Sequence, residues 1–119
     1  WNIMEGFHCY NPKNDCAQSD LESPVFEYET GKKGNCSVVG GPVYNGSKFT
    51  QLTNAYIFGD YCSGKIWALK YGSEGEILVD LITDSRIYIS SFGEGEDGEL
   101  YILGLEGNIY KFVLNKVEN

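Results

Sequence analysis

An internal repeat constrains the fold of this chain more than any other feature of its sequence. Residues 56–69 read Tyr-Ile-Phe-Gly-Asp-Tyr-Cys-Ser-Gly-Lys-Ile-Trp-Ala-Leu, and residues 101–112 read Tyr-Ile-Leu-Gly-Leu-Glu-Gly-Asn-Ile-Tyr-Lys-Phe. In both blocks an apolar β-type run meets a short turn that contains glycine, and a second alternating run follows. The turn glycines, Gly64 and Gly107, are separated by about the length of one four-stranded blade of a β-propeller. The repeat therefore predicts an all-β chain built from two four-stranded antiparallel blades.

Alternating apolar runs between turn residues give the expected strands. They are Val25–Tyr28, Cys36–Tyr44, Ala55–Tyr61, Lys65–Tyr71, Ile77–Ile82, Ile87–Phe92, Leu100–Leu103 and Asn108–Leu114. We assign residues 25–71 to the first blade and residues 76–114 to the second. Residues 1–24 form an N-terminal segment, in which Trp1–Glu5 is expected to close an upstream blade. No window keeps the apolar period of a long helix.

Two blades are too few for a closed ring, since about four to eight are typical of propellers. We therefore expect the chain to be part of a larger propeller. The remaining blades belong either to a longer parent protein or to further copies of the chain, and three copies would supply six blades. The chain begins with tryptophan instead of methionine, and we expect its natural start to have been removed or to lie upstream.

The composition excludes several classes of partner. Nine Lys and Arg residues against seventeen Asp and Glu residues give a net charge of −8. Nucleic acids and anionic membranes are bound through clustered positive charge, so neither is an expected partner. No apolar stretch approaches the roughly 20 residues of a membrane-spanning helix. Nine Tyr, six Phe and fifteen Gly residues beside three Pro are typical of a turn-rich β protein.

One cysteine pairing is favoured by strand geometry among the three that four cysteines permit. If residues 45–54 are the loop of an antiparallel hairpin and Tyr44 faces Asn54, then Cys36 faces Cys62. Directly opposed residues lie about 4.5–5.5 Å apart at Cα, which is within disulfide range. We therefore predict a disulfide between Cys36 and Cys62.

The other two cysteines, Cys9 and Cys16, then close a short polar loop. Four reduced, buried thiols are the alternative, while the spacings do not fit a zinc site. An even set of cysteines is typical of an oxidising compartment, so we expect a secreted or periplasmic protein.

Four stretches carry a family resemblance that covers almost the whole chain. They are residues 1–9 (Trp-Asn-Ile-Met-Glu-Gly-Phe-His-Cys), 36–41 (Cys-Ser-Val-Val-Gly-Gly), 58–64 (Phe-Gly-Asp-Tyr-Cys-Ser-Gly) and 91–101, which holds Ser-Phe-Gly-Glu and Asp-Gly-Glu-Leu-Tyr. In this order and spacing they resemble the C-terminal part of the glucose/sorbosone dehydrogenase family. That family includes soluble sugar dehydrogenases that use pyrroloquinoline quinone (PQQ) and the propeller of hedgehog-interacting protein. The resemblance implies a six-bladed propeller whose last two blades are present here.

The resemblance also implies PQQ and calcium as cofactors of the parent, with the catalytic histidine and most ligands upstream of this chain. The C-terminal third of the quinone-binding members contributes cations to the quinone carboxylates. Cys62 stands at the position of a lysine, and residues 88–90 (Tyr-Ile-Ser) stand at the positions of two arginines. Arg86 is the nearest cation and is the candidate cofactor-binding residue. Either this branch binds the quinone differently, or it has lost that chemistry.

The remaining candidate residues each have a structural alternative. Glu94, Glu96 and Asp97, with Glu99 nearby, could bind Ca²⁺ through carboxylate oxygens, but Asp97-Gly98 is also an ordinary hairpin turn. Other polar candidates are a possible general base, two aspartates near strand ends and two Asn-x-Ser glycan acceptor patterns, namely His8, Asp60, Asp84, Asn35 and Asn45.

Two functional hypotheses follow. In the first, the parent protein oxidises an aldose by passing a hydride to PQQ, and this chain supplies scaffold and one wall of the cofactor cleft. In the second, the chain belongs to a non-catalytic propeller that recognises a protein or a glycan through its loops. The missing cations favour the second hypothesis, and the overall resemblance favours the first.

Overall fold

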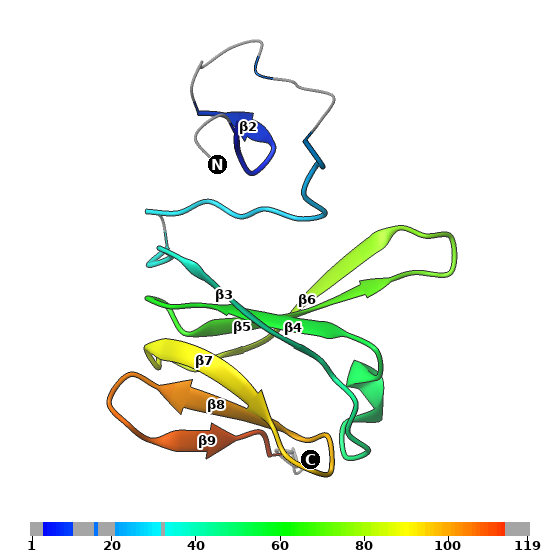
Figure 1. The fold of residues 1–119 in the computed structure, drawn as a ribbon, viewed down its shortest axis with the longest axis vertical. Helices are drawn as coiled ribbons and strands as arrows, with labels where there is room; N and C mark the ends of the chain where they lie inside the picture. The colour runs from blue at the N-terminus through cyan, green and yellow to red at the C-terminus, as the bar shows by residue number, and fades with distance from the viewer. Residues whose placement is uncertain (1–3, 11–15, 17–20, 32, 114–119) are drawn as a thin grey trace, which may run out of the picture.

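The computed structural model describes residues 4–10, 16, 21–31 and 33–113 (Figure 1). Within that part of the chain the elements are nine strands and one 3₁₀ turn. In chain order they are β1 (Met4–Glu5), β2 (His8–Cys9), β3 (Val38–Val43), the 3₁₀ turn η1 (Thr50–Leu52), β4 (Tyr56–Asp60), β5 (Lys65–Tyr71), β6 (Ile77–Asp84), β7 (Ile89–Glu94), β8 (Leu100–Gly104) and β9 (Ile109–Lys111). The prediction of an all-β chain is confirmed.

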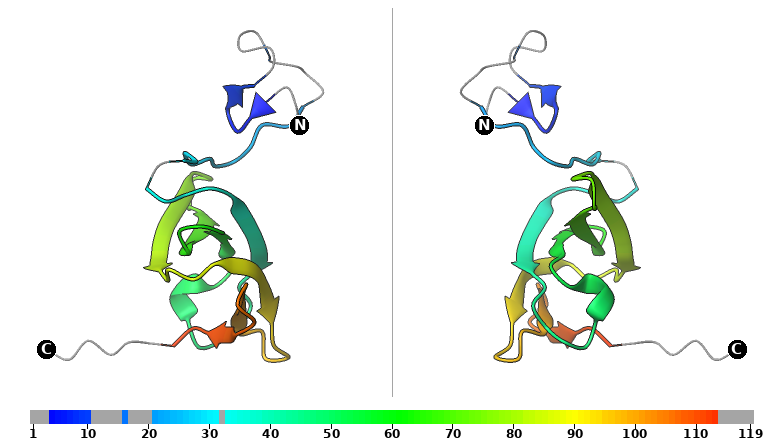
Figure 2. Two further views of the ribbon diagram at one scale, coloured as in Figure 1. Left: turned by 90° about the vertical axis from the view of Figure 1, so that its left-hand side faces the viewer. Right: turned by 90° about the vertical axis from the view of Figure 1, so that its right-hand side faces the viewer.

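The strands form three antiparallel sheets in which every hydrogen-bonded neighbour is also the neighbour in sequence. A four-stranded sheet has the order β3-β4-β5-β6, a three-stranded sheet has the order β7-β8-β9, and β1 pairs with β2. In Figure 1 the three-stranded sheet lies below the four-stranded sheet, and the β1–β2 hairpin lies above it. Figure 2 shows the same succession from both sides.

The division between the two larger sheets differs from the predicted one. We expected residues 76–114 to form a second blade of four strands, but β6 is the last strand of the first sheet, and three strands remain for the second. The cause is the turn at residues 72–75, where Gly75 has a φ of +81° and its N–H donates to the Gly72 carbonyl. This turn reverses the chain so that Ile77 lies opposite Tyr71.

Two other expected strands also differ. Residues 25–28 join no sheet. Residues 1–3 of the predicted closing strand lie outside the described residues, while Met4–Glu5 pairs with β2. Leu114, the predicted end of the last strand, also lies outside them.

The main core fills the space between the two larger sheets. It contains alternate residues of the facing strands, all of them at most 4% exposed, namely Ile57, Ile66, Ala68, Ile89, Leu100 and Ile102. β3 and β4 approach β7 closely because two glycines face the ring of Phe92. A Cβ atom at Gly41 would lie 3.0 Å from that ring, and one at Gly59 would lie 3.2 Å from it. These glycines let the two sheets pack at short range.

The register between β3 and β4 explains the first disulfide. Val38 lies opposite Asp60, and this register, continued outward, sets Cys36 opposite Cys62. The two cysteines are bonded, with their Cα atoms 5.6 Å apart. A bulge between Gly40 and Val43 shifts the far end of the pair by one residue. The predicted pairing of the cysteines is therefore confirmed, although Tyr44 exchanges hydrogen bonds with both Asn54 and Ala55.

The second disulfide joins Cys9 to Cys16, as predicted, with their Cα atoms 5.5 Å apart. Residues 11–15 of the loop that it closes lie outside the described residues. Glu27 connects this region to the segment that follows, because its carboxylate accepts a hydrogen bond from the Phe7 N–H and lies 3.1 Å from His8 Nδ1.

The two turn glycines of the sequence repeat occupy corresponding corners. Gly64 follows β4 with a φ of +76°, and Gly107 follows β8 with a φ of +101°. Their surroundings differ. Gly64 is buried, and a Cβ atom there would lie 2.5 Å from the Ile87 nitrogen, whereas a Cβ atom at Gly107 would meet nothing within 4 Å. Among the described residues, only the first corner packs against a following segment of the chain.

Candidate functional site

One face of the four-stranded sheet is lined with aromatic rings. Tyr56 and Phe58 alternate on β4, and Trp67 lies opposite Phe58 on β5. The centroids of Phe58 and Trp67 are 5.4 Å apart with an interplanar angle of 22°, and those of Tyr56 and Phe58 are 5.9 Å apart. We call these three residues the aromatic face. They point away from the three-stranded sheet, because the intervening Ile57 points into the core.

An extended segment crosses the aromatic face, and we call its residues 25–30 the strap. Phe26 lies 5.8 Å from Phe58, and Tyr28 lies 5.0 Å from Trp67, measured between ring centroids. The strap therefore contacts the sheet through side chains, without a main-chain ladder.

A groove of about 940 Å³ lies between the strap, the β1–β2 hairpin and the aromatic face. Its walls are mostly apolar, and they include Val38 and Tyr71, which are 59% and 66% exposed. Its charged residues are acidic or histidine, namely Glu5, His8, Glu27 and Glu29. The groove is large enough for a ligand of drug size.

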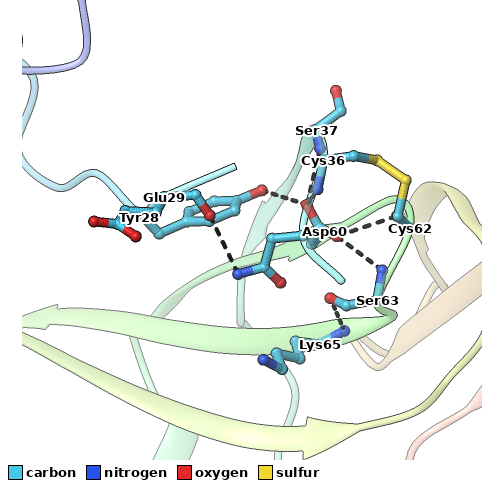
Figure 3. The surroundings of a disulfide bond; sticks show 9 residues. Tyr28, Glu29, Cys36, Ser37, Asp60, Cys62, Ser63 and Lys65 are labelled. Atoms are coloured by element: carbon cyan, nitrogen blue, oxygen red, sulfur yellow. Dashed lines mark hydrogen bonds between the residues drawn. A yellow bond between two sulfur atoms is a disulfide. The ribbon is translucent and has the colours of Figure 1, made fainter. Parts of the chain in front are cut away.

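Asp60 is the last residue of β4, hydrogen-bonded to the strap residue Tyr28, and it is fully buried. Five hydrogen bonds of 2.8–3.1 Å reach its two carboxylate oxygens, from the Tyr28 hydroxyl and from the N–H groups of Cys36, Ser37, Cys62 and Ser63. Figure 3 shows the carboxylate between the two backbone segments that the Cys36–Cys62 disulfide joins. We call Asp60 and its five donors the Asp60 cluster.

These hydrogen bonds set the charge state of the cluster. Burial by itself would raise the Asp60 pKa, but the N–H groups of Ser63 and Cys36, the Tyr28 hydroxyl and the Ser37 N–H together lower it. The Tyr28 pKa is raised, first by burial and then by its hydrogen bond to the carboxylate. Asp60 is therefore ionised and Tyr28 neutral at neutral pH.

A second buried carboxylate, Glu99, joins the two larger sheets. It accepts hydrogen bonds from the Tyr44 hydroxyl, at 2.7 and 2.9 Å from its two oxygens, and from the N–H groups of Ser47 and Lys48 at 2.9 Å. Burial would raise its pKa, but the Tyr44 hydroxyl and the two N–H groups lower it. Burial and the contact with Glu99 raise the pKa of Tyr44. We call these residues the Glu99 cluster.

The candidate calcium ligands are not brought together. Glu94, at the end of β7, and Glu96 are exposed, and Asp97 Oδ1 accepts the Glu99 N–H at 3.1 Å within the turn. Among the residues that the structure describes, no group of three His, Cys, Asp or Glu side chains could hold a metal ion. The turn chemistry accounts for Asp97, and the buried cluster accounts for Glu99.

The other candidates lie apart from one another. Arg86 is exposed in the connection from β6 to β7, with a φ of +57°, and Asp84 is exposed at the end of β6. The His8 ring lies next to Glu27, and its side chain is 79% exposed. Of the two glycan acceptor patterns, Asn45 is exposed, whereas Asn35 is partly buried and precedes a disulfide-bonded cysteine. Asp60, the remaining candidate, is fully buried and hydrogen-bonded at the centre of its cluster.

The residues of the groove do not fit PQQ. A quinone with three carboxylates requires cationic partners. The charged lining instead carries three glutamates and one histidine, and neither lysine nor arginine is among the described residues that line it. Cys62 and Ser90, at positions where cations are expected, form a disulfide and donate to the Leu103 carbonyl. The calcium of the family likewise has no ligand set in the described residues.

Sequence reasoning missed the aromatic face and the strap as a site. The signal was present in the alternation of Tyr56 with Phe58 and of Trp67 with Leu69, which we interpreted only as strand patterning. For Asp60, its place near a strand end predicts a capping or turn role as the alternative to a functional one. Its N–H donors at positions 62 and 63 fit that interpretation, but those at positions 36 and 37 and the Tyr28 hydroxyl come from distant segments.

Comparison with known proteins finds no family model that matches the chain and no solved structure that matches it. The described part of the chain contains no helix with the length and apolar character needed to cross a membrane. The two disulfides are typical of proteins from oxidising compartments.

Proposed function

We propose that this chain is a two-sheet segment of a larger β-propeller, similar to the C-terminal part of the glucose/sorbosone dehydrogenase family. The observation that carries the proposal is a correspondence between the sheets. Phe58 faces Trp67 across β4 and β5, and Ile102 faces Tyr110 across β8 and β9. Trp67 and Tyr110 each follow the turn glycine by three residues.

The corresponding faces are covered to different extents. Ile102 and Tyr110 pack against the core that the first sheet shares with the second. The aromatic face of the first sheet carries only the strap and borders the groove. A further sheet placed before the first would repeat the contact already made within the chain. A fourth strand beside β9 would complete the second sheet.

Further blades of a six-bladed ring would supply both. These blades belong to a longer parent protein, or two further copies of the chain supply them as a closed trimer. The two disulfides support a secreted or periplasmic location.

The activity that the resemblance supports is oxidation of a sugar in the intact ring, with PQQ as the hydride acceptor and calcium as a second cofactor. Because the described residues do not fit either cofactor, this chain contributes scaffold, and the catalytic residues lie in other blades. The same misfit favours a second candidate function, a non-catalytic propeller that binds a protein or a glycan.

The two candidates are separated by adding PQQ, with calcium present, to the intact protein that contains this chain. Saturable quinone binding and glucose-dependent reduction of an artificial electron acceptor support the dehydrogenase. Absence of quinone binding removes it and leaves the binding propeller.

The ring itself is tested by light scattering on the isolated chain at micromolar concentration. A trimer has a mass of about three times 13.3 kDa. A stable monomer excludes self-association and requires that the other blades come from a parent chain. The sheet correspondence fails if any intact parent structure shows the aromatic face exposed to solvent.

A further inference from the structure

Tyr28 links the strap to the buried carboxylate at the end of β4. Within the strap, Tyr28 combines two contacts, since its ring lies on Trp67 and its hydroxyl donates to Asp60 Oδ1 at 2.8 Å. Phe26 adds an aromatic contact to Phe58. The Glu29 carbonyl of the strap also accepts a hydrogen bond from Asn35 Nδ2 at 3.4 Å, and Asn35 directly precedes the disulfide-bonded Cys36.

The position of the Asp60 carboxylate depends on two backbone segments. Oδ1 accepts the N–H groups of Cys36 and Ser37, both at 2.9 Å, and Oδ2 accepts those of Cys62 and Ser63, at 3.1 and 2.8 Å. The disulfide joins the first segment to the second. Each half-cystine therefore supplies a hydrogen bond to the carboxylate as well as one sulfur of the bond (Figure 3).

The first of these segments lies at the end of the sheet, where the Asn35 carbonyl accepts a hydrogen bond from the Gly31 N–H. Cys36 and Ser37 are exposed and lie just before Val38, the first paired residue of β3. The Tyr61 N–H donates a backbone hydrogen bond to the Ser37 carbonyl at this end of the sheet. Without the disulfide, residues 33–37 could separate from residues 62–63, and the Asp60 carboxylate would lose half of its N–H donors.

We infer that the Cys36–Cys62 disulfide and the Asp60 cluster form a redox-sensitive latch that keeps the strap closed over the aromatic face. The inference concerns the isolated chain, in which the strap and the groove, and not the further sheet of the proposed ring, border the aromatic face. In the oxidised protein the four N–H groups fix Asp60, and Asp60 fixes Tyr28. In the reduced protein the strap is released and the groove opens, while the core between the two larger sheets stays intact.

The redox step is ordinary thiol–disulfide exchange with an external dithiol. A thiolate of the dithiol attacks one sulfur of the disulfide, forms a mixed disulfide and releases the other cysteine as a thiolate. The second thiol of the reductant then displaces the protein sulfur. The protein gains two electrons and two protons, and the reductant becomes a cyclic disulfide.

The test uses the full chain with Trp1→Phe, which leaves Trp67 as the sole tryptophan. Two double variants isolate the disulfides. In Cys9→Ser/Cys16→Ser, dithiothreitol can reduce only the Cys36–Cys62 bond, and in Cys36→Ser/Cys62→Ser only the Cys9–Cys16 bond. Trp67 emission, binding of an apolar dye and the far-ultraviolet circular dichroism are recorded before and after reduction, with thiol titration to verify it.

We expect reduction of the first variant to shift Trp67 emission to longer wavelength and to raise dye binding, with the strand signal retained. Before reduction, the second variant should already show the long-wavelength Trp67 emission and the raised dye binding of the open strap. Reduction should change neither of them further. Three results overturn the latch: no change in the first variant once two thiols titrate, the same reduction-dependent change in the second variant, or loss of the strand signal together with opening.

A milder variant tests the route through Asp60. Tyr28→Phe keeps the ring on Trp67 and removes only the donated hydroxyl, with both disulfides intact. The loss of one hydrogen bond should raise the open fraction roughly 2- to 10-fold. If dye binding and Trp67 emission equal those of the same chain with Tyr28 unchanged, Asp60 does not hold the strap.

Discussion

Asp60 and Glu99 are two buried carboxylates that organise distant segments in different settings. They are 0% and 7% exposed, and each accepts hydrogen bonds from a tyrosine hydroxyl and from backbone N–H groups. In both, these hydrogen bonds lower the pKa against the effect of burial, so each carboxylate stays ionised at neutral pH. The chemical device is the same in the two clusters.

The surroundings of the two clusters differ. Tyr44 of the Glu99 cluster is 1% exposed and belongs to the core between the sheets, whereas Tyr28 lies in the strap and Cys36 is exposed. Only the Asp60 cluster contains a disulfide. The Glu99 cluster is instead anchored through Tyr44 in the core between the two larger sheets, although its N–H donors Ser47 and Lys48 are exposed.

Removing the Asp60 carboxylate should have the largest effect. Asp60→Ala leaves four N–H groups and the Tyr28 hydroxyl without an acceptor, and we expect the free energy of unfolding to fall by about 3–4 kcal/mol. Urea unfolding followed by circular dichroism measures it.

The control is Asp84→Ala, an exposed aspartate at the end of β6, which should change stability by no more than about 0.5 kcal/mol. Glu99→Ala should lower the free energy of unfolding less than Asp60→Ala, because it leaves fewer hydrogen-bond donors without an acceptor. The comparison fails if Glu99→Ala is the more harmful of the two, or if Asp60→Ala behaves like the control.

The two turn glycines give the next largest effect. Gly64→Ala forces an L residue into a φ of +76° and brings Cβ to 2.5 Å from the Ile87 nitrogen, so a loss of roughly 2–4 kcal/mol is expected. Gly107→Ala meets no neighbour within 4 Å and should cost about 1–2 kcal/mol, from its φ alone. Thermal or urea unfolding of both variants measures the difference. Equal losses would show that the packing of Gly64 against residues 86–87 is not rigid.

Much of the fold could be predicted because its signals are local. Period-two alternation and turn glycines predict antiparallel strands wherever one face is buried. The Cys36–Cys62 pairing followed from hairpin register, and the bulge between Gly40 and Val43 left the cysteine end of that register intact.

The rest depends on contacts that no local pattern encodes. Alternation identifies β6 as a strand but does not say which sheet it joins, and the turn at residues 72–75 decided that. Residues 25–28 alternate like a strand, yet their rings bind to the face of the sheet instead of its edge. The donors of Asp60 come from three separate segments, so only the assembled fold brings them together.

The hydroxyl groups of the two tyrosines allow a finer comparison of the clusters. Tyr44→Phe removes the donor to Glu99 and also leaves the buried Phe49 N–H without its acceptor, so we expect a loss of about 1–2 kcal/mol. Tyr28→Phe removes a single hydrogen bond at a half-buried strap and should cost about 0.5–1 kcal/mol. Urea unfolding measures the two losses. A larger loss for Tyr28→Phe than for Tyr44→Phe would show that the Asp60 cluster is the more tightly held of the two.

The free energy of unfolding should change least with pH near neutrality. In acid it should fall, and the contributions of the two clusters to this fall can be measured separately. The folded pKa values of Asp60 and Glu99 are lowered, so their contribution is complete above the unfolded values of about 4 and is lost as the pH falls through the folded values. Both raised tyrosine pKa values act at the other limit, where stability falls as the pH rises above about 10.

The contribution of each carboxylate to the pH dependence is measured from the free energies of unfolding of the unsubstituted chain, Asp60→Asn and Glu99→Gln between pH 7 and pH 2. Each variant should lose part of the acid-dependent fall, since an amide does not titrate. An acid-dependent fall that is unchanged in both variants would mean that neither carboxylate carries the pH dependence, and the shared device would then have to be abandoned.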